Sequence, residues 1–465
     1  MNTILLHPND VLFFRDGRPM GGSLSGHGAA WPLPSVVNQA FHAALHRAGL
    51  DAKFSLPLHG HGHVGGNGVR NAEDDRKFGS LKTAGPFPVF VSGEKRTWYF
   101  PRPLDAGENG SAMPTFLPLE KGFDQELSSL PEAVSLPVAN TKPPTKKTPE
   151  PWFDSAAYAA YLGGTPESPN SVSFLENSEF CDTEFSFGIG IDPATGTQDG
   201  ERFYSAHYLR LREDWRMGVL AHAPDKDFSH SEYGDDLVRA LLNGSGAEII
   251  AGGQQRICTA TMEAATGAPL PLPRGMDGNF AGADGKFLVK WTLLSPAVWP
   301  EMTAGTSKRG TERKSHPGGW LPNWIDSEFG KVLLQSISKE ERRRRRNLNY
   351  GGKGYSSEEN ASPIAATLVA AMVGKPVAVT GYAMASRHAE AGPKPAHPAV
   401  PAGSVYYFEA ADEDAARKLA AALNWHGTDT SFSTIRNRRS TLMGEKGFGL
   451  GVCSTWKYHD GNIPR

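Results

Sequence analysis

Histidines are the first residues in this sequence that could perform chemistry. The run LHGHGHVGG at 58–66 places three of them at alternate positions, a pattern that can bind a transition metal, but no carboxylate lies beside it. His42 and His46 are four residues apart and would share one helix face, yet a zinc protease needs glutamate where Ala43 stands. We interpret both sets as solvated histidines and predict no metal site. The alternating residues are His59, His61 and His63.

Two acidic motifs also have a composition that suits catalysis. YGDDLV, at 233–238, has the acidic pair of a two-metal polymerase site, but that site needs a hairpin between apolar strands. Here LVRALLNG continues as a helix that stops at Gly244, so we predict that Asp235 caps this helix. His459 and Asp460 form an isolated dipeptide without a distant partner. The sequence therefore predicts no catalytic residue.

Other catalytic signatures do not occur in the sequence. GxxxxGK[ST], GxSxG and CxxC are all missing, so nothing indicates nucleotide hydrolysis, serine hydrolysis or zinc chemistry. Three cysteines, Cys181, Cys258 and Cys453, are odd in number and widely separated. This spacing argues against a disulfide framework and favours a reducing cytosol. We predict no cofactor.

Arginine and glycine occur together in two stretches, and this combination suits RNA phosphates. In FFRDGRPMGGSLSGHGAAWPLP, at 13–34, Arg15 and Arg18 precede a glycine-rich segment. Local pairing of both arginines with Asp16 is an alternative of equal weight. In TIRNRRSTLMGEKGFGLG, at 434–451, glycines allow close backbone approach beside four cations. These cations are Arg436, Arg438, Arg439 and Lys446.

A run of arginines at 342–346, followed by NLNYGGKGY, has a similar composition. We favour a solvated helix end or loop for this run. Whether it contacts RNA, protein or water stays open at this point.

Short strands and a few helices must position these stretches. Strands are predicted at 4–6 and 11–14, before a helix with Ser35 as N-cap and Gly49 as its stop. A second helix is predicted over 412–425. Further strands or hairpins are predicted within 185–200, 202–214, 247–263, 286–296, 375–385, 404–410 and 447–458.

The length of 465 residues exceeds what one hydrophobic core usually organises. We predict two domains, at 1–280 and 281–465, and interpret about 54–180 as insertions or long loops with a few short elements and no core of their own. Both halves mix strands and helices without regular alternation, which favours an α+β duplication.

Charge and hydropathy narrow the choice of partners. The formal net charge of −2 argues against a globally basic nucleic-acid protein, although it allows a local basic groove. No run of about 18 apolar residues and no signal peptide is evident. We therefore expect a soluble, cytoplasmic protein without a membrane partner.

Several segments together resemble one family, the third Cmr subunit of type III-B CRISPR effector complexes. This family is a Cas-five-like group of the Cas RAMP superfamily. The resembling segments follow the family's order and span nearly the whole chain. They are PNDVLFFRDGRPM at 8–20, PLPSVVNQAFHAAL at 32–45, IGIDPATGTQDGERFYSAHYLRL at 189–211, AGGQQR at 251–256, AVPAGSVYYFEA at 399–410 and GFGLGV at 447–452.

The resemblance implies a fold and a role. The fold would be two ferredoxin-like (RRM-like) domains of RAMP architecture, with long insertions in the first and a glycine-rich loop in the second. The role would be to hold the 5′ tag of the crRNA and to bridge the large Cas ten-type subunit to the RAMP backbone subunits, as a binding subunit without nuclease residues. The RNA-binding residues would be Arg15, Arg18, His42, Arg256, Arg436, Arg438, Arg439, Lys446, Gly447, Phe448 and Gly449.

The sequence departs from the family at two places. His42 stands where an arginine is common, and a histidine is mostly neutral at pH 7. Gln254 and Gln255 stand where charged residues are common. Two alternatives remain: an endoribonuclease that matures crRNA with His42 or His46 as general acid or base, and a scaffold that contacts only proteins.

Overall fold

The structure is a computed structural model, and it describes most of the chain. The described residues are 1–15, 24–25, 29–48, 81–107, 112–119, 130–143, 146, 149–163, 173–224, 236–242, 246–282, 285–306, 312–335, 363–383 and 392–459.

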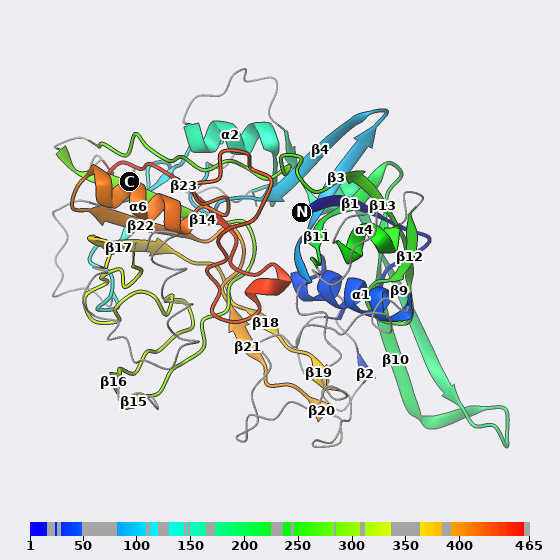
Figure 1. The fold of residues 1–465 in the computed structure, drawn as a ribbon. Coiled ribbons are helices and arrows are strands. Elements are labelled where there is room, and N and C mark those ends of the chain that lie inside the picture. Colours follow the sequence, from blue (N-terminus) through cyan, green and yellow to red (C-terminus); the bar gives the residue numbers. More distant parts are fainter. Residues whose placement is uncertain are drawn as a thin grey trace, which may run out of the picture.

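An eight-stranded sheet organises the first part of the chain (Figure 1). Its order is β12-β13-β1-β11-β3-β4-β7-β8, and neighbouring strands are antiparallel. The strands are β1 (Asn2–Pro8), β3 (Lys82–Ser92), β4 (Lys95–Pro101), β7 (Trp152–Asp154), β8 (Phe174–Leu175), β11 (Trp215–His222), β12 (Ala247–Ile250) and β13 (Ile257–Ala264).

Helices cover both faces of this sheet. Ile4 and Leu6 of β1 pack in one core with residues of α1 (Pro34–Arg47) and α4 (Leu237–Leu242). Leu5, which points to the other face, packs in a second core that includes Tyr158 and Tyr161 of α2 (Ser155–Gly163). This alternation is the period of two that a strand buried on both faces requires.

Helix α1 begins one residue before the predicted cap. Its N-cap is Leu33, which makes no side-chain cap bond, and Pro34 occupies the first turn. Proline suits this position because its fixed φ matches a helix and its missing N–H would be unpaired there anyway. Ser35 is therefore inside the helix, and Gly49 lies outside the described residues.

A long hairpin projects from the body of the molecule (Figure 1). It consists of β9 (Cys181–Ile191) and β10 (Gln198–Leu211), and the two-residue β2 (Leu24–Ser25) pairs with β10 in parallel. This confirms the strands predicted within 185–200 and 202–214. The short helix α3 (Asn177–Phe180) leads into β9.

A four-stranded antiparallel sheet forms the centre of the second part. Its order is β17-β22-β14-β23, and α6 packs against it. Helix α6 begins after Asp412, whose side chain accepts a hydrogen bond from the backbone of Ala415. The predicted helix and the predicted strand at 286–296 are thus confirmed. The elements are β14 (Phe287–Leu293), β17 (Ala366–Met372), β22 (Val405–Ala410), α6 (Glu413–Leu423) and β23 (Gly451–Ser454).

Short elements complete the described fold, which mixes helices with mostly antiparallel sheets and so confirms the α+β class. They are β5 (Phe116–Pro118), β6 (Val138–Asn140), β15 (Gly305–Thr306), β16 (Glu312–Arg313), β18 (Val377–Val379), β19 (Tyr382–Ala383), β20 (Gly392–Pro393), β21 (His397–Ala399) and η3 (Gly444–Lys446). Within the described ranges, no helix has the length and apolar character needed to cross a bilayer.

Two predictions about strands were wrong. Residues 82–101 are not short elements of an insertion, because β3 and β4 are long strands inside the eight-stranded sheet. Residues 11–14 form no strand, because only Leu12 pairs there, with Leu209 of β10. The carbonyl of Phe13 instead accepts a hydrogen bond from the backbone of Gly253, at 2.8 Å. After β1, the chain is therefore held by single contacts to two different elements, to β10 through Leu12 and to the turn between β12 and β13 through Phe13.

A buried charged cluster, the Asp105 cluster, joins the 81–163 region to the second sheet. Lys290 of β14 approaches the Asp105 carboxylate at 2.9 Å. Tyr161 and Tyr407 donate hydrogen bonds to the same carboxylate at 2.7 and 3.1 Å. Burial lowers the pKa of Lys290, and the Asp105 charge opposes this shift. The cluster ties three distant parts of the sequence together.

Candidate nucleic-acid interface

A cationic and aromatic corner forms where β10 passes the turn after β1. We call it the Tyr208 corner, and it consists of Phe13, Tyr208, Gln254 and Arg256. The Arg256 guanidinium lies over the Tyr208 ring at 5.0 Å, and the Tyr208 hydroxyl donates to the Gln254 side chain at 2.9 Å. Phe13 packs against Tyr208 with ring centroids 5.6 Å apart. An arginine stacked on a ring is a surface that suits RNA bases and phosphates.

Glycines hold the 251–256 segment in this corner. Gly252 has a φ of +85°, and a Cβ there would come within 2.6 Å of the Phe13 carbonyl oxygen. Gln254 and Gln255 also have positive φ, at 55° and 53°. This confirms the bent hairpin predicted within 247–263. The tight turn places Arg256 beside Tyr208.

Carboxylates beside the Tyr208 corner pair with Arg256 and with the neighbouring Arg210. Asp10 approaches Arg256 at 3.5 Å and Arg210 at 3.0 Å, and Arg210 also pairs with Glu184. These pairs are largely exposed, so each contributes little to stability. Arg15 is exposed two residues after Phe13, whereas Arg18 lies outside the described residues.

The glycine-rich loop, residues 436–451, lies between the two sheets. Gly447 has a φ of +97°, and a Cβ there would meet the β3 backbone at Thr83 and Ala84 at 2.9 Å. Gly449 has a φ of +75°, and a Cβ there would lie 2.0 Å from the backbone nitrogen of Ser440. Both positions therefore require glycine. Phe448 is fully buried, so its ring can support RNA binding only by holding the loop in place.

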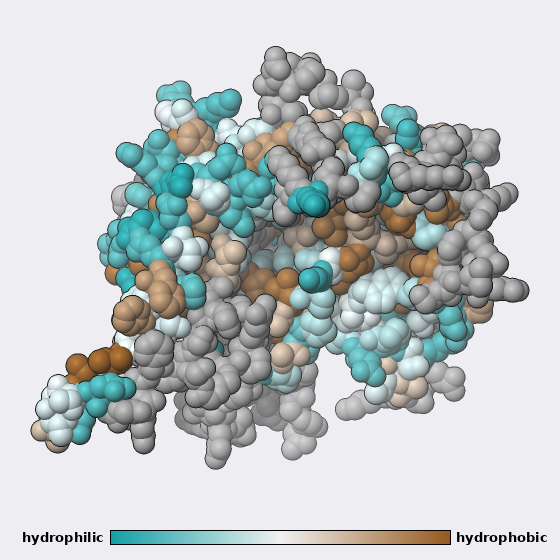
Figure 2. Space-filling view, turned by 180° about the vertical axis from the view of Figure 1, so that it is seen from behind, coloured by the Kyte–Doolittle hydropathy of each residue, from teal (hydrophilic) through white to brown (hydrophobic). Residues whose placement is uncertain are grey.

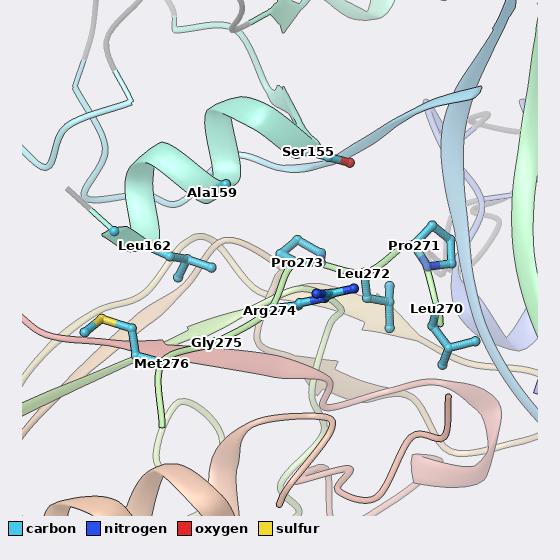
Figure 3. Close-up of a pocket in the computed structure, with 11 residues that line it drawn as sticks. Ser155, Ala159, Leu162, Leu270, Pro271, Leu272, Pro273, Arg274, Gly275 and Met276 are labelled. Atoms are coloured by element: carbon cyan, nitrogen blue, oxygen red, sulfur yellow. The ribbon is translucent and has the colours of Figure 1, made fainter. Parts of the chain in front are cut away.

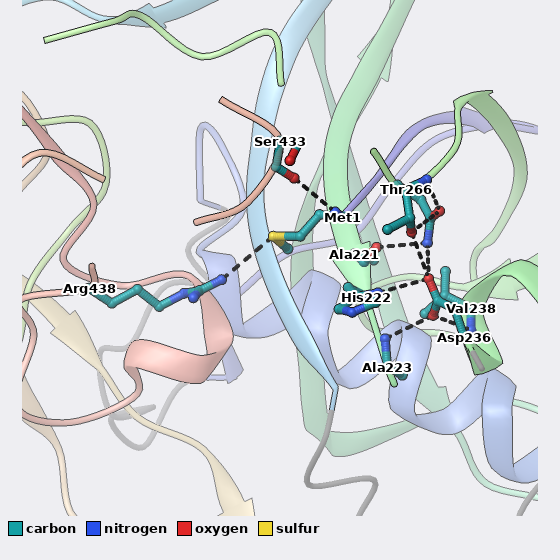
Figure 4. A network of polar contacts seen from close by, with 10 residues as sticks. Met1, Ala221, His222, Ala223, Asp236, Val238, Thr266, Ser433 and Arg438 are labelled. Carbon is teal, nitrogen blue, oxygen red and sulfur yellow. Dashed lines mark hydrogen bonds and ion pairs between the residues drawn. The ribbon is translucent and has the colours of Figure 1, made fainter. Parts of the chain in front are cut away.

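The cations of this loop point to different neighbours. Arg436 is exposed and approaches Asp429 at 3.4 Å. Arg438 is partly buried and contacts the Met1 sulfur at 3.9 Å, as Figure 4 shows. Arg439 donates to the Ala422 carbonyl at 2.7 Å. Lys446 is half-buried at the end of η3.

The predicted RNA-binding residues fall into two groups. Arg438 lies at the Met1 end of β1, whereas Arg256 lies beside Asp10, beyond the other end. Since β1 has seven residues, the groups are separated by roughly 20 Å or more. One RNA strand that contacts both must therefore run the length of this strand. His42 lies on α1, half-buried, with its ring 4.7 Å from that of His46.

The β9–β10 hairpin carries an exposed apolar surface that the sequence reasoning missed. We call it the hairpin ridge: Phe185, Phe187, Ile189 and Ile191 of β9. Phe185 and Phe187 are 58% and 67% exposed, and Figure 2 shows apolar residues along the projecting hairpin. The alternation in FSFGIGI was the available signal, but alternation alone does not say whether the apolar face is covered. Exposed apolar surfaces of this kind commonly bind a partner.

Other candidate residues are placed away from these surfaces or outside the described residues. His59, His61, His63, Asp235 and the 342–346 run lie outside the described residues. Asp236 caps α4 by accepting from the Val238 backbone at 3.1 Å. His459 is buried, with its ring nitrogen 3.3 Å from the Asn140 carbonyl oxygen.

Metal and thiol chemistry find no support in the described part of the chain. No group of three or more potential metal ligands occurs there. All three cysteines are free and buried, and burial raises the pKa of Cys258 to about 12. A thiol with a raised pKa is a poor nucleophile at neutral pH.

A cavity of about 540 Å³ lies between α2 and the segment 270–276 (Figure 3). Its lining includes Leu162, Leu272, Pro273 and Arg274, and the Arg274 guanidinium lies 4.3 Å from the centre of the Phe432 ring. None of the predicted RNA-binding residues lines this cavity.

Comparison with known proteins identifies relatives of the chain. The profile of the family "CRISPR-associated protein (Cas_Cmr3)" matches residues 4–456. Two similar solved chains come from "Cryo-EM structure of the Type III-B Cmr-beta bound to cognate target RNA" and from the same complex with AMPPnP. They are 13% and 12% identical to this chain, each with a TM-score of 0.37, 87% of this chain covered and 86% of the other. No curated protein matches.

Proposed function

Because the chain belongs to the Cas_Cmr3 family of CRISPR-associated proteins, we propose that it is a non-catalytic crRNA-binding subunit of a type III-B effector complex. In this role it holds the 5′ tag of the crRNA and bridges the large Cas ten-type subunit to the RAMP backbone subunits. The observation that carries the proposal is the family match, which includes both sheets and the glycine-rich loop.

The two sheets support the proposal of two ferredoxin-like domains. Along the chain, β1-α1-β3-β11-α4-β13 follows the β-α-β-β-α-β order of that fold, with β13-β1-β11-β3 adjacent in the sheet. In the second sheet, β14, β17, β22 and β23 take the same relative positions, and α6 again follows the third strand. A shared order in both halves is what a duplication would produce.

Three surfaces supply contacts for a single RNA strand. The glycine-rich loop offers cations and close backbone approach, and the Tyr208 corner offers a stacked arginine. The hairpin ridge adds exposed aromatic rings, on which bases of any sequence can stack. The RNA would therefore be held by charge, by shape and by stacking on Phe185 and Phe187.

Binding of tag RNA across a salt series distinguishes these contributions. We expect log affinity to fall linearly with log salt, at a slope of roughly −0.7 per neutralised phosphate. The double variant Phe185→Ala, Phe187→Ala should lose about 1–3 kcal/mol per stacked base without a change of slope. Arg256→Ala should instead make the slope shallower. Fluorescence anisotropy of labelled tag RNA measures both quantities.

Phe329→Ala is the matched control, because Phe329 is 65% exposed but lies outside the three surfaces. It should leave affinity and slope unchanged. Binding that does not depend on salt would contradict the proposal. If Phe329→Ala and the double variant lose the same affinity for tag RNA, the hairpin ridge does not contribute to RNA binding.

A protein-only scaffold is the second candidate, and the hairpin ridge favours it, since apolar surfaces also mark protein contacts. In that case the double variant should weaken assembly with the other subunits, while binding of tag RNA by the purified chain stays undetectable. Loss of RNA affinity without loss of assembly favours RNA binding.

An endoribonuclease that uses His42 or His46 is the remaining alternative. The non-catalytic proposal predicts that labelled repeat RNA stays intact when it is incubated with the purified chain without divalent metal. Site-specific cleavage that His42→Ala abolishes would establish the enzyme instead. Cleavage that persists in His42→Ala and His46→Ala would indicate a contaminating nuclease.

A further inference from the structure

Arg438 is a charged side chain whose charge is poorly compensated. Its Nε atom is buried and has no hydrogen-bond partner among the described residues, and Nη2 contacts only the weakly accepting sulfur of Met1. No described carboxylate lies within ion-pair distance of it, and Glu445 acts only from further away. Burial lowers the pKa of Arg438 to about 10. A desolvated guanidinium without an anion is destabilising.

A second cation lies close to Arg438. Lys82 is the first residue of β3, is exposed, and forms no ion pair among the described residues. Although much of the side chain is accessible, partial desolvation of the ammonium and then the positive charge of Arg438 lower the pKa of Lys82. The two cations therefore repel each other. Gly447, in the same loop as Arg438, packs directly on the next two residues of β3. Arg438 also contacts Met1, whose neighbour Asn2 pairs with Ala221 on β11, and the next residue of β11, His222, pairs with Lys82. Both cations therefore lie at the same end of the first sheet.

The buried carboxylate at this end of the sheet belongs to Asp236, and it already has several hydrogen-bond partners. His222 is the register partner of Lys82 on the adjacent strand β11, and its Nδ1 lies 2.9 Å from Asp236. Asp236 also accepts hydrogen bonds from Asn2, Thr266 and the backbone of Ala223 and Val238 (Figure 4). Asp236 therefore cannot neutralise Lys82 and Arg438 as well.

We propose that Lys82 and Arg438 form a phosphate-binding site at the junction of the two sheets. The planar guanidinium of Arg438 can donate two parallel hydrogen bonds to phosphate oxygens, and the Lys82 ammonium adds a compact positive charge. The ligand is a backbone phosphate of bound RNA, and this part rests on the proposed function. Free phosphate has the same chemistry and would bind the same residues.

Thermal unfolding in pyrophosphate, compared with chloride at equal ionic strength, tests the site on the full chain. Pyrophosphate should raise the Tm of the wild type by several degrees in a concentration-dependent way. Lys82→Met and Arg438→Met should lose this shift, whereas Lys95→Met, an exposed lysine at the start of β4, should keep it. Without phosphate, Arg438→Met should have an equal or higher Tm, because it removes an uncompensated charge.

The salt series with tag RNA provides the second arm. Lys82→Met should make the slope of log affinity against log salt shallower by about 0.7 for each phosphate that the variant no longer neutralises. If pyrophosphate raises the Tm but the protein does not bind tag RNA, the phosphate site is supported and the proposed function is refuted. A changed RNA slope without a pyrophosphate shift identifies the RNA backbone as the ligand. If neither arm responds to Lys82→Met and Arg438→Met, the phosphate site is refuted.

Discussion

Replacing Asp105 with alanine is expected to lower the free energy of unfolding by about 3–5 kcal/mol. Asp105 and Lys290 are both buried, 2.9 Å apart, and Asp105→Ala would leave the Lys290 ammonium without its counter-charge. Two tyrosine hydroxyls, of Tyr161 and Tyr407, would lose their acceptor as well. Chemical denaturation followed by tryptophan fluorescence measures the loss. Because the cluster joins the 81–163 region to β14 and β22, that region should become protease-sensitive.

Glu413→Ala is the control for this prediction, since Glu413 pairs with Arg417 on the exposed face of α6. An exposed pair of this kind should cost less than about 1 kcal/mol. The double variant Asp105→Leu, Lys290→Met should recover much of the stability, because it removes both charges. If Asp105→Ala unfolds at the same denaturant concentration as Glu413→Ala, the Asp105–Lys290 pair does not stabilise the contact between the 81–163 region and the second sheet.

Gly449→Ala is expected to destabilise the protein by about 2–5 kcal/mol, from a left-handed conformation and from crowding. The added Cβ would lie 2.0 Å from the Ser440 nitrogen and 2.8 Å from the Arg439 carbonyl carbon. These are backbone atoms, so the 438–440 segment must move. If this segment helps to hold RNA, affinity for tag RNA should fall together with stability. Thermal unfolding and the RNA-binding assay report the two effects.

Gly93→Ala isolates the conformational part of this effect. Gly93 also has a positive φ, of 55°, but a Cβ there would meet nothing within 4 Å. It should cost only about 1–2 kcal/mol and leave RNA binding unchanged. Equal losses of stability in Gly93→Ala and Gly449→Ala would show that the close contact between Gly449 and Ser440 does not contribute to stability.

Elements with a strong local signal were predictable from the sequence. Asp412 before an amphipathic run marked the start of α6, and the apolar residues around Trp291 marked β14. The exception is β3, which contains Pro86 and Pro88, because proline normally argues against a strand inside a sheet. β3 pairs with β4 only from Val89 onward, so both prolines lie where β3 has β11 alone as its partner.

The candidate site was less predictable, because it depends on which faces remain uncovered. Arg256 and Arg438 were named from their composition, but nothing local indicated that β1 separates them. Phe448 has the residue type of an RNA-stacking ring and is instead buried. Lys82 is an ordinary lysine in the sequence, and only the folded arrangement of β1, β11 and β3 places it at the same end of the sheet as Arg438.

Crosslinking of crRNA within the assembled complex, with photoreactive groups along the 5′ tag, tests the central claim most directly. The account predicts crosslinks to three regions of this chain: the glycine-rich loop near Arg438, the corner around Tyr208, and Phe185 or Phe187 on the hairpin. A tag that crosslinks only to other subunits, or to this chain only around Phe329 and Leu333, would contradict it.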